Sequence, residues 1–302
     1  MTEQQQLTEI QKIATSCIER WGEDYKTQNF SGKLGRFVNQ LGSNKELLGK
    51  LFLDIVMFYN YYSRERLDQI MGEFYHIIIN ELKLDENFTI YSRIEDDSKI
   101  DSSNFFLEEF KILNNISNHF SYDIEKLDIE NFDNIQNVIF IDDIIGSGKT
   151  VETFFEKNKK KLLKVNCFIF CIELLEEGKS HLEKFFNKNE IKCEIICHNL
   201  HKKAFSQDHI FRENFKENEV LLRDFERGLW RKKSKNILGY ENSQAIVSFF
   251  RNTPNNTLSS FWFENEKWRG LFPRDDRKPA FKKVKKNSVK YNVKKMENSV
   301  DG

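Results

Sequence analysis

The chain has 302 residues, of which 47 are basic and 47 are acidic, so its formal net charge is zero. This balance gives no global electrostatic reason to expect nucleic acid as a ligand. No segment has roughly eighteen consecutive apolar residues, and the start MTEQQQLTEI lacks the features of a signal peptide. We therefore expect a cytoplasmic protein without a membrane span, whose five cysteines are reduced thiols.

The N-terminal part of the chain is predicted to be helical. Apolar residues recur at helical spacing from Leu34 to Ile78, and no proline occurs before Pro254. We interpret residues 1–86 as a helical accessory region. It is expected either to cap a sheet or to form a surface for a partner.

Strands that alternate with helices are predicted after this region. The predicted strands are 88–92, 138–141, 166–175 and 191–197, and the predicted helices between them include 105–116 and 181–188. This alternation favours right-handed crossovers and a parallel sheet, so the predicted fold class is α/β. A further helix is predicted over 215–230 and a further strand over 244–250.

The central stretch of the sequence is NVIFIDDIIGSGKT, from Asn137 to Thr150. A buried strand is predicted up to Ile141, and Asp142 and Asp143 are expected to end it. A glycine-containing turn and a helix start follow. Glycines let backbone N–H groups surround an anion, and a helix dipole favours negative charge at the helix start. The stretch therefore predicts a phosphate site formed by Gly146, Ser147, Gly148, Lys149 and Thr150.

One chemistry that uses such a turn is the P-loop, GxxxxGK[ST]. Gly148, Lys149 and Thr150 fit its second half, but the place of the first glycine holds Asp143. A carboxylate there would face the phosphates that the loop should wrap. A P-loop-like NTPase, with Glu173 as its second acid, is accordingly the least favoured alternative.

The same stretch closely resembles the ribose-phosphate site of type I phosphoribosyltransferases. That pattern is an apolar strand, two acids, two apolar residues and a small loop with hydroxyl groups and glycine. The resemblance implies that Asp142 and Asp143 are catalytic residues that hold the ribose of phosphoribosyl pyrophosphate (PRPP) and bind its Mg²⁺. It also implies a type I phosphoribosyltransferase-like core, in which the loop from Gly146 to Thr150 holds the 5-phosphate.

One position departs from the pattern. The purine-salvage transferases carry an acidic residue, assigned to proton transfer, where this chain has Gly146. Purine salvage is therefore not expected. Either the acceptor needs no base here, or another residue supplies one, or the site only binds.

The loop after the predicted strand 88–92 holds pyrophosphate in the resembled family. Small residues and a cation suit that role, because backbone donors and an Arg fork both bind phosphate oxygens. The candidates are Arg93, Ser102 and Ser103. The same loop also carries four acids that argue against this role: Glu95, Asp96, Asp97 and Asp101. They would repel pyrophosphate unless Mg²⁺ lies between the acids and the pyrophosphate.

The C-terminal part extends the resemblance. TPNNTL, which starts at Thr253, and WRGLFPR, which ends at Arg274, resemble phosphoribosyltransferase-like proteins of bacterial conflict and anti-phage systems. Some of those are encoded beside retron reverse transcriptases and are described as toxic effectors. Asn255, Asn256 and Arg274 are candidates for a pocket rim. The aromatic residues between 261 and 272 predict a core plug or a wall for a flat ligand.

These observations give three predicted regions: helices over 1–86, a phosphoribosyltransferase-like α/β domain over 87–274, and a basic disordered tail over 275–302. The expected function is Mg²⁺-dependent transfer of phosphoribosyl from PRPP to an unknown acceptor, as an effector of antiviral defence. A non-catalytic PRPP- or nucleotide-sensing module is the alternative. The resemblance implies a reverse transcriptase or its non-coding RNA–DNA as a partner, and a homo-oligomer is a further expectation.

Overall fold

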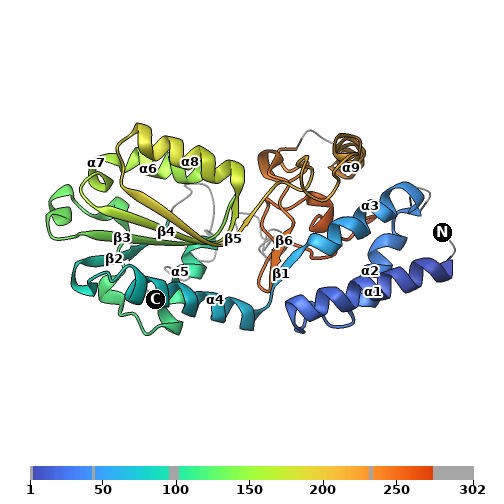
Figure 1. Cartoon of the computed structure of the whole chain (residues 1–302), viewed down its shortest axis with the longest axis horizontal. Coiled ribbons are helices and arrows are strands. Elements are labelled where there is room, and N and C mark those ends of the chain that lie inside the picture. The colour runs from blue at the N-terminus through green and yellow to red at the C-terminus, as the bar shows by residue number, and fades with distance from the viewer. Residues whose placement is uncertain (1–2, 43–44, 95–101, 231–233, 275–302) are drawn as a thin grey trace, which may run out of the picture.

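The computed structural model describes residues 3–42, 45–94, 102–230 and 234–274, and the predicted tail lies outside these ranges. The described chain forms two lobes that lie side by side (Figure 1). The larger lobe is a four-stranded sheet with helices on both faces. The smaller lobe combines a two-stranded sheet with helices from both ends of the described chain.

The large sheet consists of β2 (Thr89–Ser92), β3 (Asn137–Ile145), β4 (Asn166–Leu175) and β5 (Cys193–His201). The strands follow one another in the order β2-β3-β4-β5, and every neighbouring pair is parallel. The predicted α/β class with a parallel sheet is confirmed. All carboxyl ends of these strands lie at one edge, where parallel α/β sheets bind their ligands.

Each face of the large sheet is covered by its own helices. On one face α4 (Arg64–His76), which continues into a π-helical turn (Ile77–Glu81), and α5 (Ser102–Leu113) pack on Ile139 and Ile141. On the other face α6 (Lys149–Lys157), α7 (Lys159–Leu162) and α8 (Glu176–Lys188) pack on Val138 and Phe140. This division arises because successive strand residues point to opposite faces.

The small lobe is built around β1 (Asn60–Tyr62) and β6 (Val247–Phe249), which pair in parallel. Its helices are α1 (Glu3–Trp21), α2 (Phe30–Asn39), α3 (Lys45–Phe58) and α9 (Phe215–Trp230). One apolar core joins residues from 10–61 with residues from 204–272. Of the N-terminal helices, α4 therefore covers the large sheet, whereas α1, α2 and α3 share their core with the C-terminal segment. The domain boundary after residue 86 stays a prediction.

The aromatic C-terminal stretch forms a core plug, not a ligand wall. Phe261 and Phe272 are buried, and both rings stack on Tyr59 with centroid distances of 5.1 and 5.3 Å. Trp268 is also buried and makes an edge contact with Phe37 at 5.2 Å. These contacts attach α2 and the end of α3 to the C-terminal segment.

Strand β1 lies in a region that we predicted to be helical. Tyr59 and Tyr61 pack in the core of the small lobe, whereas Tyr62 packs in the core under α4. This alternation is that of a strand, and the pairing with β6 stabilises it. The predicted strand 244–250 is correspondingly shorter and belongs to the small sheet. None of the described helices is long and apolar enough to cross a membrane.

Candidate functional site

Strand β3 does not end at the acid pair as predicted. It continues through Asp142 and Asp143 to Ile145. The ladder with β4 persists there, because Asp142 pairs with Cys171 and Ile144 pairs with Glu173. The apolar residues Ile144 and Ile145 extend the strand, so the two acids lie near its carboxyl end but still within it.

The two acids nevertheless sit at an irregularity of the strand. Ile141 and Ile144 pack on the face of α4 and α5, although a regular alternation would place residues three apart on opposite faces. Asp142 Oδ1 accepts a hydrogen bond from Asp143 N, and Asp143 Oδ1 accepts one from Ile144 N, both at 2.9 Å. Asp143 is only 7% exposed and Asp142 is partly buried. Each carboxylate thus fixes the backbone that follows it.

The glycine-containing loop is short and tightly packed. Only Gly146, Ser147 and Gly148 separate β3 from α6. Gly148 has a φ of 79°, and a Cβ there would lie 2.8 Å from Leu182 Cγ. A Cβ on Gly178 of α8 would lie 2.1 Å from Gly146 O, so α8 supports the loop directly.

The start of α6 has the character of an anion site. Its N-cap residue is Gly148, which has no side chain that could accept a hydrogen bond from the first N–H groups of the helix. Ser147 Oγ accepts a 3.5 Å hydrogen bond from Lys149 N, and Lys149 and Thr150 are exposed. The predicted phosphate residues are therefore together at the carboxyl edge of the sheet.

A segment of the small lobe, residues 238–244, packs against this loop and is called the arch here. Four of its non-glycine residues have φ between 52° and 64°: Leu238, Glu241, Asn242 and Gln244. Each such residue costs about 1–3 kcal/mol, and strain of this kind collects at functional sites. Side chains of α9 hold the arch, because Glu226 Oε2 accepts a hydrogen bond from Leu238 N and Arg223 donates one to Asn242 Oδ1.

Two contacts join the arch and its neighbours to the loop. Lys149 Nζ lies 3.0 Å from Glu241 Oε2, and this hydrogen bond raises the pKa of Lys149. Asn256 lies against the first loop residue, because a Cβ on Gly146 would be 2.2 Å from Asn256 Nδ2. Of the other rim candidates, Asn255 O accepts from Tyr240 N, and Arg274 donates to Thr253 O.

Of the predicted pyrophosphate residues, Arg93 directly follows β2, the strand that pairs with β3. Arg93 Nη1 donates a 3.0 Å hydrogen bond to Asn104 Oδ1, and Nη2 lies 3.8 Å from Asp123 Oδ2. Arg93 is thereby held near the start of α5. Ser102 and Ser103 begin this helix, but their side chains are outside the described residues, as are residues 95–101 with their four acids.

Glu173 of β4, considered in the sequence only as the second acid of an NTPase, has a structural role that the sequence did not predict. It is fully buried beside Ile144 and accepts hydrogen bonds from Asn60 at 3.0 Å, from Tyr62 and from Asn199 at 3.0 and 3.1 Å. His201 Nε2 lies 3.0 Å from its second oxygen. The signal was an acid inside an otherwise apolar strand. The cluster ties β1 of the small lobe to β4 and β5 of the large lobe.

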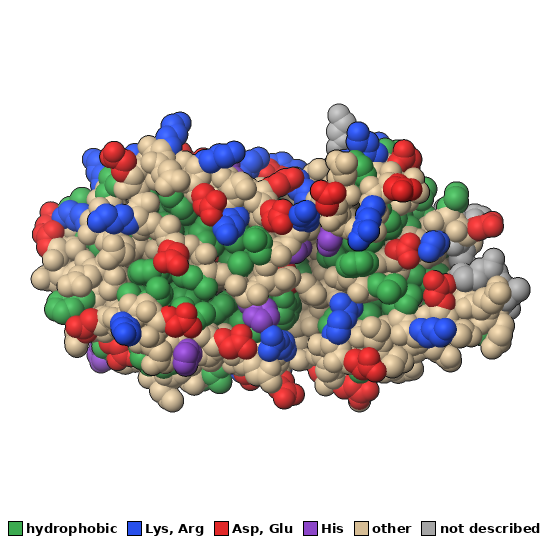
Figure 2. Space-filling view, viewed as in Figure 1, with side chains coloured by type: hydrophobic (Ala, Val, Ile, Leu, Met, Phe, Trp, Pro, Cys, Tyr) green, Lys and Arg blue, Asp and Glu red, His purple; other side chains and the backbone are tan. Residues whose placement is uncertain are grey.

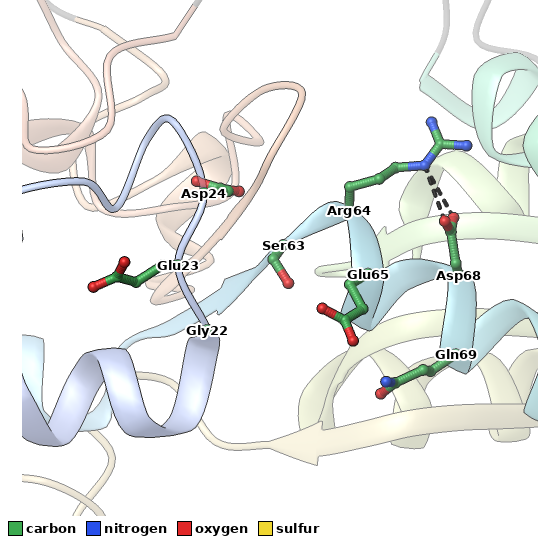
Figure 3. Close-up of a pocket in the computed structure, with 8 residues that line it drawn as sticks. All are labelled: Gly22, Glu23, Asp24, Ser63, Arg64, Glu65, Asp68 and Gln69. Carbon is green, nitrogen blue, oxygen red and sulfur yellow. Dashed lines mark hydrogen bonds and ion pairs between the residues drawn. The ribbon is translucent and has the colours of Figure 1, made fainter.

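A separate cavity of about 600 Å³ lies between the loop after α1 and the start of α4 (Figure 3). Four of its eight lining residues are acidic, and Arg64 is paired with Asp68 at 3.0 Å. It contains none of the predicted site residues. Figure 2 shows acidic and basic side chains intermingled over the face in view. Within the described residues no three His, Cys, Asp or Glu side chains gather as a metal site.

A parallel sheet with an acid pair and a glycine loop at its carboxyl edge is the arrangement of a phosphoribosyltransferase-like protein. The model of the PRTase-CE family matches residues 34–274, and the chain belongs to this family. The match begins within α2, so it leaves out α1, and it includes the large lobe, the arch and Asn256. No curated protein and no solved structure matches the chain significantly.

Proposed function

We propose that the protein binds PRPP with Mg²⁺ at the carboxyl edge of the large sheet and transfers its phosphoribosyl group to an acceptor. The observation that carries the proposal is the acid pair of β3 followed directly by the glycine loop and by the start of α6, whose N-cap is a glycine. Asp142 and Asp143 hold the ribose hydroxyls. The loop and Lys149 hold the 5-phosphate, and Arg93 faces the pyrophosphate.

The acid pair also fits a magnesium ion. Proteins bind Mg²⁺ through one or two carboxylates together with substrate phosphates, and Asp142 and Asp143 supply two adjacent carboxylates. When bound, the ion would neutralise pyrophosphate charge. The described residues do not gather a third acidic ligand, so the remaining oxygens would come from PRPP and water.

Transfer breaks the bond between the anomeric carbon and a pyrophosphate oxygen, and a bond from the acceptor forms at the same carbon. Positive charge develops on the sugar as pyrophosphate leaves with the bonding electron pair. The buried carboxylate of Asp143 stabilises this charge electrostatically, because a pre-organised group in a poorly hydrated place needs no reorganisation. Gly146 supplies no proton-transfer group, so the acceptor reacts without a base at this position.

The biological setting of the proposal is an effector of bacterial antiviral defence in the cytoplasm. The resemblance of the TPNNTL and WRGLFPR stretches to conflict-system proteins supports it. A reverse transcriptase or its RNA–DNA product would then be the partner, and a homo-oligomer remains part of the proposal.

A non-catalytic PRPP sensor is the second candidate, and Gly146 favours it because the loop lacks a proton-transfer group. The NTPase alternative is weaker. Asp143, at the place of the first P-loop glycine, lies inside β3, and only three residues separate β3 from α6. That is too short for a loop that wraps a triphosphate.

The test is calorimetric titration with Mg²⁺-PRPP, with Mg²⁺-ATP as the comparison. Asp143→Asn should weaken PRPP binding at least about ten-fold, because it removes a charged hydrogen-bond acceptor but keeps an oxygen for Ile144 N. Asp133→Asn is the matched control, since Asp133 is 65% exposed and pairs only with Lys164 in the described structure. Unchanged PRPP affinity in Asp143→Asn would refute the site. Pyrophosphate release on turnover separates the enzyme from the sensor.

A further inference from the structure

We infer that Asn256 is a ligand-binding residue of the phosphate loop, whose carboxamide donates a hydrogen bond to the 5-phosphate. The inference rests on the proposed function and adds to it a residue from the other lobe. It starts from the contact between Asn256 and Gly146, which are 110 positions apart in the sequence.

The backbone of Asn256 is held firmly. Its carbonyl oxygen accepts hydrogen bonds from Ala245 N at 3.1 Å and from Ser243 Oγ at 2.7 Å. A Cβ on Gly239 would lie 2.1 Å from the same oxygen, so the arch closes on it without a gap. The strained arch thus fixes the place from which the Asn256 side chain extends.

The carboxamide of Asn256 is directed at the loop. The Nδ2 atom of Asn256 occupies the space that a side chain at position 146 would take. Asn256 is partly buried, and its carboxamide makes no hydrogen bond to the part of the chain that the structure describes. Because partly buried amides ordinarily find partners, this group is available to a ligand that enters the loop.

An amide suits a phosphate monoester at this position. It adds a neutral donor to the N–H groups at the start of α6 and to the ammonium group of Lys149, and it introduces no charge that would repel the ligand. The N–H donors come from the large lobe and the amide from the small lobe. A sugar phosphate would therefore contact both lobes through its phosphate group.

The experiment compares three ligands by calorimetry: ribose 5-phosphate, Mg²⁺-PRPP and Mg²⁺-pyrophosphate. Asn256→Ala should weaken ribose 5-phosphate and PRPP at least about ten-fold, as expected for a hydrogen bond to a charged group. Pyrophosphate affinity should not change, because pyrophosphate does not occupy the loop. Asn256→Asp should weaken the first two ligands further, since a carboxylate faces the phosphate. Asn187→Ala, an exposed position on α8, is the matched control.

The outcomes separate the two proposals. If the wild type binds neither PRPP nor ribose 5-phosphate, the proposed function fails and the inference fails with it. If the wild type binds both and Asn256→Ala binds them equally well, the inference alone is wrong. An equal loss of pyrophosphate affinity in Asn256→Ala would indicate a merely structural role and also overturn it.

The contact itself has an independent test in thermal unfolding. Gly146→Ala should lower the unfolding midpoint slightly, because the new methyl group displaces the end of the Asn256 side chain from its place beside the loop. The double variant Gly146→Ala/Asn256→Ala should recover most of this loss, because the truncated side chain vacates that space. No recovery would show that Asn256 is not what occupies the space beside Gly146.

Discussion

Replacing Glu173 with alanine tests the contact between the two lobes. The change leaves the buried side chain of Tyr62 and the partly buried side chains of Asn60 and Asn199 without their acceptor. An unsatisfied donor costs about 1–3 kcal/mol when it is fully buried, which gives an upper bound of about 3–9 kcal/mol for three donors. Water that enters the vacated space lowers this cost, so we expect a loss of about 3–5 kcal/mol in the free energy of unfolding.

Urea denaturation measures this loss, with the slope of the transition as a check that the same surface unfolds. Glu177→Ala is the control, because Glu177 is 66% exposed and its ion pair with Lys203 should contribute no more than about 1 kcal/mol. Glu173→Gln keeps one acceptor oxygen and should lie between wild type and Glu173→Ala. A loss below about 1 kcal/mol in Glu173→Ala, at an unchanged slope, would refute the reasoning.

Three further predictions concern the loop, the arch and pH. Glu241→Gln should tighten PRPP binding a few-fold in calorimetry, because Lys149 loses its carboxylate partner; weaker binding would contradict this. Gly148→Ala should cost about 1–3 kcal/mol in urea unfolding through its positive φ, whereas Gly228→Ala, with open space around it, should cost nothing; equal effects would contradict this. Burial lowers the pKa of His198 below 6.5, so the unfolded chain binds its proton more readily. Unfolding free energy should thus fall as pH drops below 6.5, and fall less in His198→Gln.

Local signals predicted much of the large lobe. Strand β4 and helix α9 have the predicted bounds, because a continuous apolar run and a long amphipathic pattern are properties of the segment itself. The predicted end of β3 was wrong because we expected the two carboxylates to end the strand, whereas the ladder with β4 continues past them. Strand β1 was missed because three residues carry little pattern, and its partner lies far away in the sequence.

The sequence likewise predicted one part of the candidate site and missed another. The acid pair and the loop are contiguous, so their order in the sequence already indicates a phosphate site. The contacts of Glu241 and Asn256 with the loop depend on how the small lobe docks, and no local pattern encodes that. Glu173 was visible as an acid in an apolar strand, but its partners come from two strands that are distant in the sequence, β1 and β5.

The shared core of residues 10–61 and 204–272 has a consequence for how the protein is made. Chains emerge from the ribosome N-terminus first and fold unit by unit. Helices α1, α2 and α3 are synthesised early. Their apolar faces stay uncovered until the aromatic residues up to Phe272 have also been synthesised. The large lobe, whose strands and covering helices lie between Arg64 and His201, has all its parts much earlier. The arch and Asn256 are therefore synthesised after every strand of the large lobe, so a nascent chain that stops before them has the loop of the candidate site without its contacts from the small lobe.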